Sequence, residues 1–141
     1  MARYILFMKP NIAEAQYAEG PSAEAAAAMN EYNEQLSNAG VLLALDGLHP
    51  TSEGARVDFA GGKPSVTDGP FAESKELIGG YWIIQAKDKA EAIEWAKRVP
   101  SVQGDPFQIE VRRIYDMADH PEDVQAAATL SEEPPEQTVE R

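Results

Sequence analysis

The chain has 141 residues and is 43% hydrophobic, enough for one domain with a packed core and short for two. Its 24 acidic and 12 basic residues give a net charge of −12, which argues against nucleic acid as a partner, because a phosphate backbone requires clustered Lys and Arg. The absence of cysteine excludes disulfides, thiolate catalysis and cysteine-ligated zinc.

The first expected element is a strand from Arg3 to Lys9. Its apolar run, residues 4–8, is too short for a signal peptide or a membrane span, so no membrane association is expected, and the lack of cysteine fits an intracellular location. Apolar side chains fall on both faces of this strand: Tyr4, Leu6 and Met8 on one, Ile5 and Phe7 on the other. That pattern predicts a strand buried on two sides.

A helix is expected next, from about Ser22 to Asn38, closed by Gly40 as a left-handed cap. Its apolar positions recur at helical spacing: Ala25, Met29, Tyr32 and Leu36. A second strand, residues 41–45, follows and is again apolar on both faces.

The alternating segment 55–60, the pair Gly61-Gly62 and the segment 64–67 together predict a β-hairpin. A single turn is expected over residues 74–78, and a third apolar strand over 81–85, with Tyr81 and Trp82 on opposite faces. Asp88 and Glu91 then resemble a capping box for a helix that buries Ala92, Ala96 and Val99 and ends before Pro100. The last expected strand covers residues 108–115.

The resulting order, β-α-β, an inserted hairpin and β-α-β, predicts an α+β fold of the ferredoxin-like βαββαβ type. Two helices can cover only one face of such a sheet, so strands that are apolar on both faces require a second cover. We expect a homodimer joined through the open sheet faces, a dimeric α+β barrel. The alternative is a monomer in which residues 117–130 fold back over that face.

The domain is expected to span residues 1–115, with 116–141 as an acidic C-terminal extension. This extension holds eight acidic residues and one Arg, a net charge of −7. Its first half, with Val124, Ala127, Ala128 and Leu130, predicts a short helix, whereas the part beyond Ser131 has too little apolar surface to order.

Three segments of the chain resemble the YCII-related family, in its DGPF type: Leu45 to Pro50, Val66 to Ile84 with Asp68-Gly69-Pro70-Phe71 at its centre, and Glu91 to Pro100. The resemblance covers roughly residues 3–115 and leaves out the acidic tail. It implies a dimeric α+β barrel in a bacterial cytoplasmic protein, with a pocket near the DGPF segment. It also implies two possible roles. The wider family suggests catalysis by a histidine–aspartate pair, and some DGPF relatives resemble partners of sigma factors, which suggests a regulatory role.

Asp68 lacks the usual backbone partner of a turn carboxylate, because the residue two positions on is Pro70, which has no N–H. Its carboxylate is therefore expected to accept from the N–H of Phe71 or from a donor that the fold brings in, which makes it a candidate site group. Gly69 and Pro70 suit a turn, and Phe71 suits a cavity plug or a ligand contact. With Lys75, the nearest cation, these three residues are the predicted ligand-binding set.

His49 is the only histidine before the tail, where His120 is expected to be exposed. An imidazole suits proton transfer near neutral pH, so His49 and Asp68 are the candidate catalytic pair, with Asp68 orienting the ring. The competing interpretation is a loop histidine without catalytic duty and a purely structural Asp68. No metal or cofactor is expected, since no ligand motif supports His49, Asp46 and Asp68 as a metal set.

Two functions follow from these residues. The first is a small enzyme that acts on a small organic molecule. The second is a non-catalytic module that binds a ligand or a regulatory protein, tied to sigma-factor-type transcriptional control.

Overall fold

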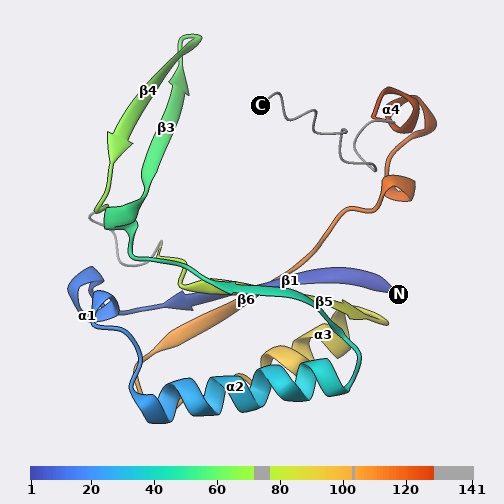
Figure 1. Cartoon of the computed structure of the whole chain (residues 1–141). Coiled ribbons are helices and arrows are strands. Elements are labelled where there is room, and N and C mark those ends of the chain that lie inside the picture. Colours follow the sequence, from blue (N-terminus) through green and yellow to red (C-terminus); the bar gives the residue numbers. More distant parts are fainter. Residues whose placement is uncertain (72–76, 103, 129–141) are drawn as a thin grey trace, which may run out of the picture.

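The computed structural model describes residues 1–71, 77–102 and 104–128. Its centre is a sheet of four strands in the order β2-β5-β1-β6, in which every neighbouring pair is antiparallel (Figure 1). The strands are β1 (Ala2–Pro10), β2 (Leu42–Gly47), β5 (Gly80–Ala86) and β6 (Phe107–Arg113). The four strands expected from the sequence are thus confirmed, each with bounds shifted by one or two residues, and the chain has an α+β fold.

Two helices, α2 (Ala23–Asn38) and α3 (Lys89–Ala96), lie on the same face of this sheet (Figure 1). Strands β3 (Ala55–Ala60) and β4 (Lys63–Asp68) form a separate two-stranded hairpin. The remaining segments are short: α1 (Glu14–Ala18), η1 (Thr51–Glu53), η3 (Met117–Asp119) and α4 (Glu122–Ala127). The sequence patterns did not predict α1, η1 or η3, and the turn expected over residues 74–78 lies largely outside the described residues.

Helix ends follow the predicted capping chemistry. The side chain of Ser22 accepts a hydrogen bond from the Ala25 N–H at 3.1 Å, and Gly40 takes a positive φ of 72° after α2. At α3, the Asp88 carboxylate accepts from the Glu91 N–H at 2.9 Å. The reciprocal bond differs from a standard capping box, because the Glu91 carboxylate accepts from the Lys87 N–H, one residue before the cap.

The core lies between the sheet and the two long helices. Leu6, Leu36 and Ile84 are fully buried there. Tyr32 and Trp82 pack edge to face, with ring centroids 5.5 Å apart. Their polar atoms have partners inside the core: the Tyr32 hydroxyl donates to the Trp95 carbonyl at 2.8 Å, and the Trp82 indole N–H donates to Asn33 Oδ1 at 2.8 Å.

The opposite face of the sheet is only half covered. Along β5, Trp82 and Ile84 are buried, whereas Tyr81 and Ile83 between them are half-buried, so the predicted division of Tyr81 and Trp82 between faces is confirmed. Ile5 and Phe7, which alternate with the buried residues of β1, are half-buried as well. No helix of the described chain lies across this face in Figure 1.

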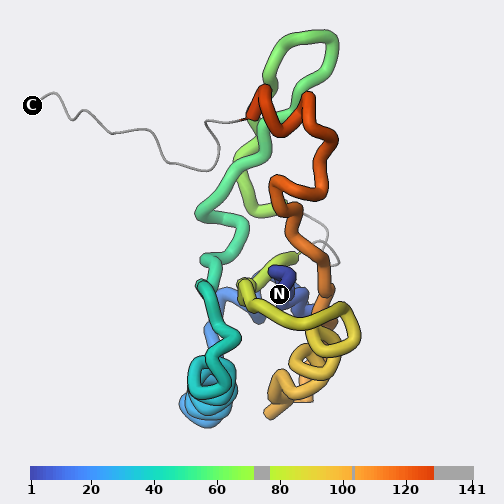
Figure 2. Tube along the Cα trace, turned by 90° about the vertical axis from the view of Figure 1, so that its right-hand side faces the viewer, coloured from blue at the N-terminus to red at the C-terminus, as the bar shows by residue number. Residues whose placement is uncertain are grey.

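Two arms rise from this open side, at opposite ends of the sheet (Figures 1 and 2). One is the hairpin β3–β4, which turns through Gly61 and Gly62, both at positive φ as predicted. The other is the tail, residues 115–128, in which α4 confirms the short helix expected there. The described part of this tail stands away from the sheet, while Leu130 and the predicted disorder beyond Ser131 lie outside the described residues.

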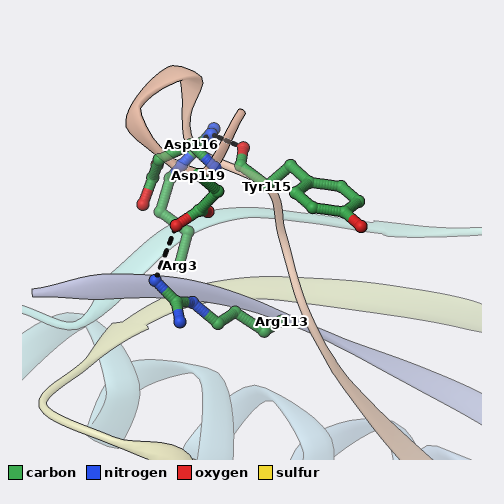
Figure 3. A network of polar contacts seen from close by, with 5 residues as sticks. All are labelled: Arg3, Arg113, Tyr115, Asp116 and Asp119. Carbon is green, nitrogen blue, oxygen red and sulfur yellow. Dashed lines mark hydrogen bonds and ion pairs between the residues drawn. The ribbon is translucent and has the colours of Figure 1, made fainter. Parts of the chain in front are cut away.

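A polar network fixes the root of the tail to the ends of β1 and β6 (Figure 3). Arg3 contacts the Tyr115 carbonyl at 3.1 Å and the Asp116 carboxylate at 3.3 Å. Arg113 pairs with Asp119 at 3.3 Å, and the Asp119 carboxylate also accepts from the Asp116 N–H at 2.8 Å. Two of the acidic residues of the tail are therefore neutralised where it leaves the sheet.

Truncation of a buried core side chain should be far more costly than the same truncation at an exposed site. Leu36→Ala leaves a cavity at a side chain with 0% exposure and is expected to lower the free energy of unfolding by about 2–5 kcal/mol. Leu48→Ala deletes the same atoms from a side chain that is 45% exposed, and should cost under about 1 kcal/mol. Urea unfolding at equal protein concentration measures both, and equal losses would contradict the placement of the core.

The buried phenol of Tyr32 should lower the stability of the fold at alkaline pH. Burial raises the pKa of its phenol to about 12, against an opposing effect of Arg98. Because this folded-state pKa exceeds the unfolded value of about 10, the contribution is complete below about pH 10 and is lost as the pH rises toward about 12. Between about pH 9 and about pH 11, wild type should therefore lose about 1 kcal/mol more stability than Tyr32→Phe. Tyr115→Phe, which removes the hydroxyl of an exposed side chain, is the matched control for the substitution itself.

Candidate functional site

A cleft of about 890 Å³ opens at the end of the sheet, on the side of the helices. Helices α1 and α2, the loop after β2 and the loop before β6 supply its walls. Its polar lining includes Gln16, Tyr17, Asn30, Asn33, His49 and Asp105, and its apolar lining includes Met8, Ile12, Met29, Leu48 and Phe107. An apolar hollow with a few convergent polar groups is the usual form of a small-molecule site.

Helix α1 holds the loop that carries His49. The Tyr17 hydroxyl contacts two carbonyl oxygens, that of Leu48 and that of Gly79 at 3.0 Å. The Leu48 N–H donates to the same Gly79 carbonyl at 2.9 Å, so the loop is tied to the start of β5 as well. Burial raises the pKa of Tyr17, with a smaller contribution from Glu14, so the phenol stays a hydrogen-bond donor at neutral pH.

Thr51 joins this loop to the DGPF segment. Glu14 of α1 accepts hydrogen bonds from both the N–H and the hydroxyl of Thr51, the latter at 2.9 Å. The Thr51 oxygen in turn accepts from the Phe71 N–H at 3.2 Å. Thr51, which lies two residues after His49, therefore connects the His49 loop to helix α1 and to the DGPF turn.

Gly69 packs directly against the same threonine. A Cβ atom built at Gly69 would lie 1.7 Å from the Thr51 carbonyl oxygen, so only glycine fits this approach. The Gly69 N–H donates to the Gly54 carbonyl at 3.0 Å, and the following peptide bond to Pro70 is cis. The glycine of the DGPF segment thus serves the contact between the hairpin root and the η1 turn.

The two candidate catalytic residues occupy different places. His49 is exposed and lines the cleft. Asp68 is exposed at the end of β4, opposite Ala55, and is outside the cleft lining. Within the described residues, no hydrogen bond or ion pair joins His49 to Asp68, so their pairing stays a prediction.

Of the two donors expected for Asp68, the Phe71 N–H is wrong, because it donates to the Thr51 hydroxyl instead, and a donor brought in by the fold stays a prediction. Gly69, Pro70 and Phe71 are also outside the cleft lining. Phe71 is half-buried and carries the Arg56 guanidinium 3.9 Å above its ring centroid, a cation–π contact. Lys75, the fourth predicted ligand residue, lies outside the described residues.

Three residues that organise this region were missed by the sequence patterns: Glu14, Tyr17 and Thr51. Helix α1 has five residues and no side-chain N-cap bond, so it lacks the periodicity and the capping motif that predict helices. The spacing of Glu14 and Tyr17, three residues apart, was the available signal, since it puts both side chains on one helix face.

A second polar pair lies on the open face of the sheet. The Tyr81 hydroxyl donates to Asp46 Oδ2 at 2.9 Å across the β2–β5 ladder, and this hydrogen bond raises the pKa of Tyr81. Among the described residues, no three acidic, histidine or cysteine side chains are grouped so that they could hold a metal ion. None of the helices in the described residues is long and apolar enough to cross a membrane.

Comparison with known proteins relates the chain to a family model and to a bacterial protein. A family model described as the YCII-related domain matches residues 2–118. An uncharacterized protein of Rhizobium meliloti (strain 1021) is 33% identical over 76 residues, which cover 54% of this chain and 61% of that protein. The match thus spans less than two thirds of the relative's length.

Replacement of Gly69 should disturb the site more than replacement of a glycine with free space around it. Gly69→Ala must displace the Thr51 carbonyl and is expected to cost about 1–3 kcal/mol of stability. Gly47→Ala is the control, because a Cβ there meets nothing within 4 Å. Urea unfolding and the amide NMR shifts of residues 49–54 measure the effect. Equal stability and unchanged Thr51 shifts in Gly69→Ala would contradict the contact.

Proposed function

Because this chain belongs to the family of YCII-related domains, we propose that it binds a small organic molecule in the cleft beside His49. The observation that carries the proposal is the tethered loop after β2, in which Tyr17 holds the Leu48 carbonyl before His49 and Glu14 holds Thr51 after it. A site gains precision when such contacts fix its backbone before the ligand arrives. His49 is the group of this loop that can transfer a proton.

The charge of the cleft narrows the class of ligand. Its described lining includes the carboxylates of Glu19 and Asp105 and no Lys or Arg. An anion would meet two like charges there without a compensating cation. A neutral or positively charged molecule with an apolar body fits the lining better, with its polar groups facing His49, Asn30 and Asp105.

In the enzymatic form of this proposal, His49 acts as general acid or base and Asp68 is its candidate orienting partner. The DGPF turn reaches the His49 loop through Thr51, which supports an indirect link between the two residues. Gly69, Pro70 and Phe71 then belong to the frame around the site, and any direct ligand contact by them requires the turn to approach the cleft mouth. Lys75 stays a proposed ligand contact.

The proposed assembly is a cytoplasmic homodimer with the ferredoxin-like dimeric α+β barrel fold. The antiparallel order β2-β5-β1-β6 supports the ferredoxin-like part, and two helices on a single face support the dimer. Half-buried Ile5, Phe7 and Ile83 on the other face are apolar groups that a second copy of the sheet would cover.

A second candidate function, a non-catalytic interaction module linked to sigma-factor-type regulation, is favoured by one observation. The hairpin exposes three large apolar side chains, Val57, Phe59 and Val66. Exposed apolar surface of this kind commonly marks a protein contact.

The ligand proposal is tested by a fragment screen of amines and neutral heterocycles, read by amide NMR shifts on the ¹⁵N-labelled chain. Hits should shift cleft amides such as those of Leu48 and Asn30, and His49→Gln should weaken their binding about tenfold or more. His120→Gln is the matched control, because the other histidine stacks on Tyr115 in the tail.

The enzymatic form is separated from simple binding by turnover of those hits. His49→Ala and Asp68→Asn should each lower it, and unchanged turnover in both variants would remove the acid–base role. Hits that shift only hairpin amides, with no dependence on His49, would favour the interaction module instead.

A further inference from the structure

The hairpin is two-sided in chemistry although both sides face solvent. Its cross-strand pairs put Val57 opposite Val66 and Phe59 opposite Pro64 on one side. Arg56, Asp58, Lys63 and Thr67 alternate with these residues and fall on the other side. Every residue of both strands is exposed, with Phe59 at 78% and Val66 at 67%.

A hairpin of this kind needs a cover. Two strands without further support are marginally stable in water, and every residue of this pair stays exposed within the described chain. Its apolar side would therefore be stabilised by contact with another surface. The hairpin rises at one end of the open sheet face, so a second copy of the chain that covered this face would lie beside it (Figure 1).

Two sheets can meet face to face about a twofold axis that runs either along the strands or across them. With the axis along the strands, the two hairpins meet at one end and the two tails at the other. With the axis across the strands, each hairpin meets the tail of the partner, because hairpin and tail rise from opposite ends of the sheet (Figure 1).

Charge favours the second arrangement. The described part of the tail, residues 116–128, holds four acidic residues and no Lys or Arg, whereas residues 55–68 of the hairpin carry two cations and two anions. Asp116 and Asp119 pair with Arg3 and Arg113, so the acidic charge of this segment lies at Glu122 and Asp123 of α4. An axis along the strands would bring two such acidic segments together at one end of the dimer, against their mutual repulsion. An axis across the strands separates the tails and puts each beside a neutral hairpin.

The tail also offers an apolar surface at the right place. Helix α4 exposes Val124 at 41%, together with Ala126 and Ala127, and the Arg3 and Arg113 contacts fix the point from which the tail rises. The residues of α4 that are charged, Glu122 and Asp123, are at its start.

From these observations, and resting on the proposed sheet-to-sheet dimer, we infer that the apolar side of the β3–β4 hairpin packs on the tail of the second copy, with α4 as its main contact. The tail is then part of the dimer interface, and each protomer contacts its partner at both ends of its sheet.

Cross-linking tests the arrangement directly, because the chain has no native cysteine. Phe59→Cys chains are mixed with Val124→Cys or Ala127→Cys chains and oxidised or treated with a short bismaleimide. At least one mixture should give a covalent dimer in several-fold higher yield than any single variant alone. Glu24→Cys, on α2 at the far side of the sheet, is the matched control and should give no such increase with Phe59→Cys.

Other outcomes overturn the inference. Efficient dimers from Phe59→Cys alone would show hairpins paired with each other. A cross-link within one chain of a Phe59→Cys/Val124→Cys double variant would show that the hairpin packs on its own tail. Sedimentation of the cysteine-free protein distinguishes failure of the proposed dimer from failure of the proposed contact. A monomer in solution would contradict both the sheet-to-sheet dimer and the hairpin-to-tail contact. A dimer that gives no hairpin-to-tail cross-links would contradict the contact alone.

Discussion

The architecture depends on a mismatch between a sheet with two apolar faces and helices that cover one of them. Leu6, Leu36 and Ile84 close the helix side completely. Ile5, Phe7 and Ile83 leave the other side half covered, and the hairpin and the tail stand at its two ends. The hairpin and the described tail contribute no residue to the buried core, and these two segments flank the open face.

The DGPF segment has a structural role that its sequence did not predict. Its glycine is required by the approach to the Thr51 carbonyl, and its last N–H is taken by the Thr51 hydroxyl. Thr51 is itself held by Glu14. The segment therefore acts on the His49 loop through a neighbour, and this explains how a conspicuous motif can affect a cleft that it does not line.

The sequence predicted the sheet, both long helices and the hairpin because each has a local cause: a two-residue or helical period, a cap such as Ser22 or Asp88, or the pair Gly61-Gly62. It failed where the cause is distant in the chain. The partner of Thr51 is Glu14, 37 residues away, on a helix of five residues without a capping bond. Likewise, the destination of the Phe71 N–H depends on a loop that begins 20 residues earlier.

The close fit of Gly69 against Thr51 has a mechanical consequence. The hairpin root and the η1 turn meet at this contact and at the Gly69–Gly54 hydrogen bond, without room for an intervening side chain. Because Gly69 touches the Thr51 backbone directly, a displacement of the hairpin root would also displace the loop segment two residues after His49.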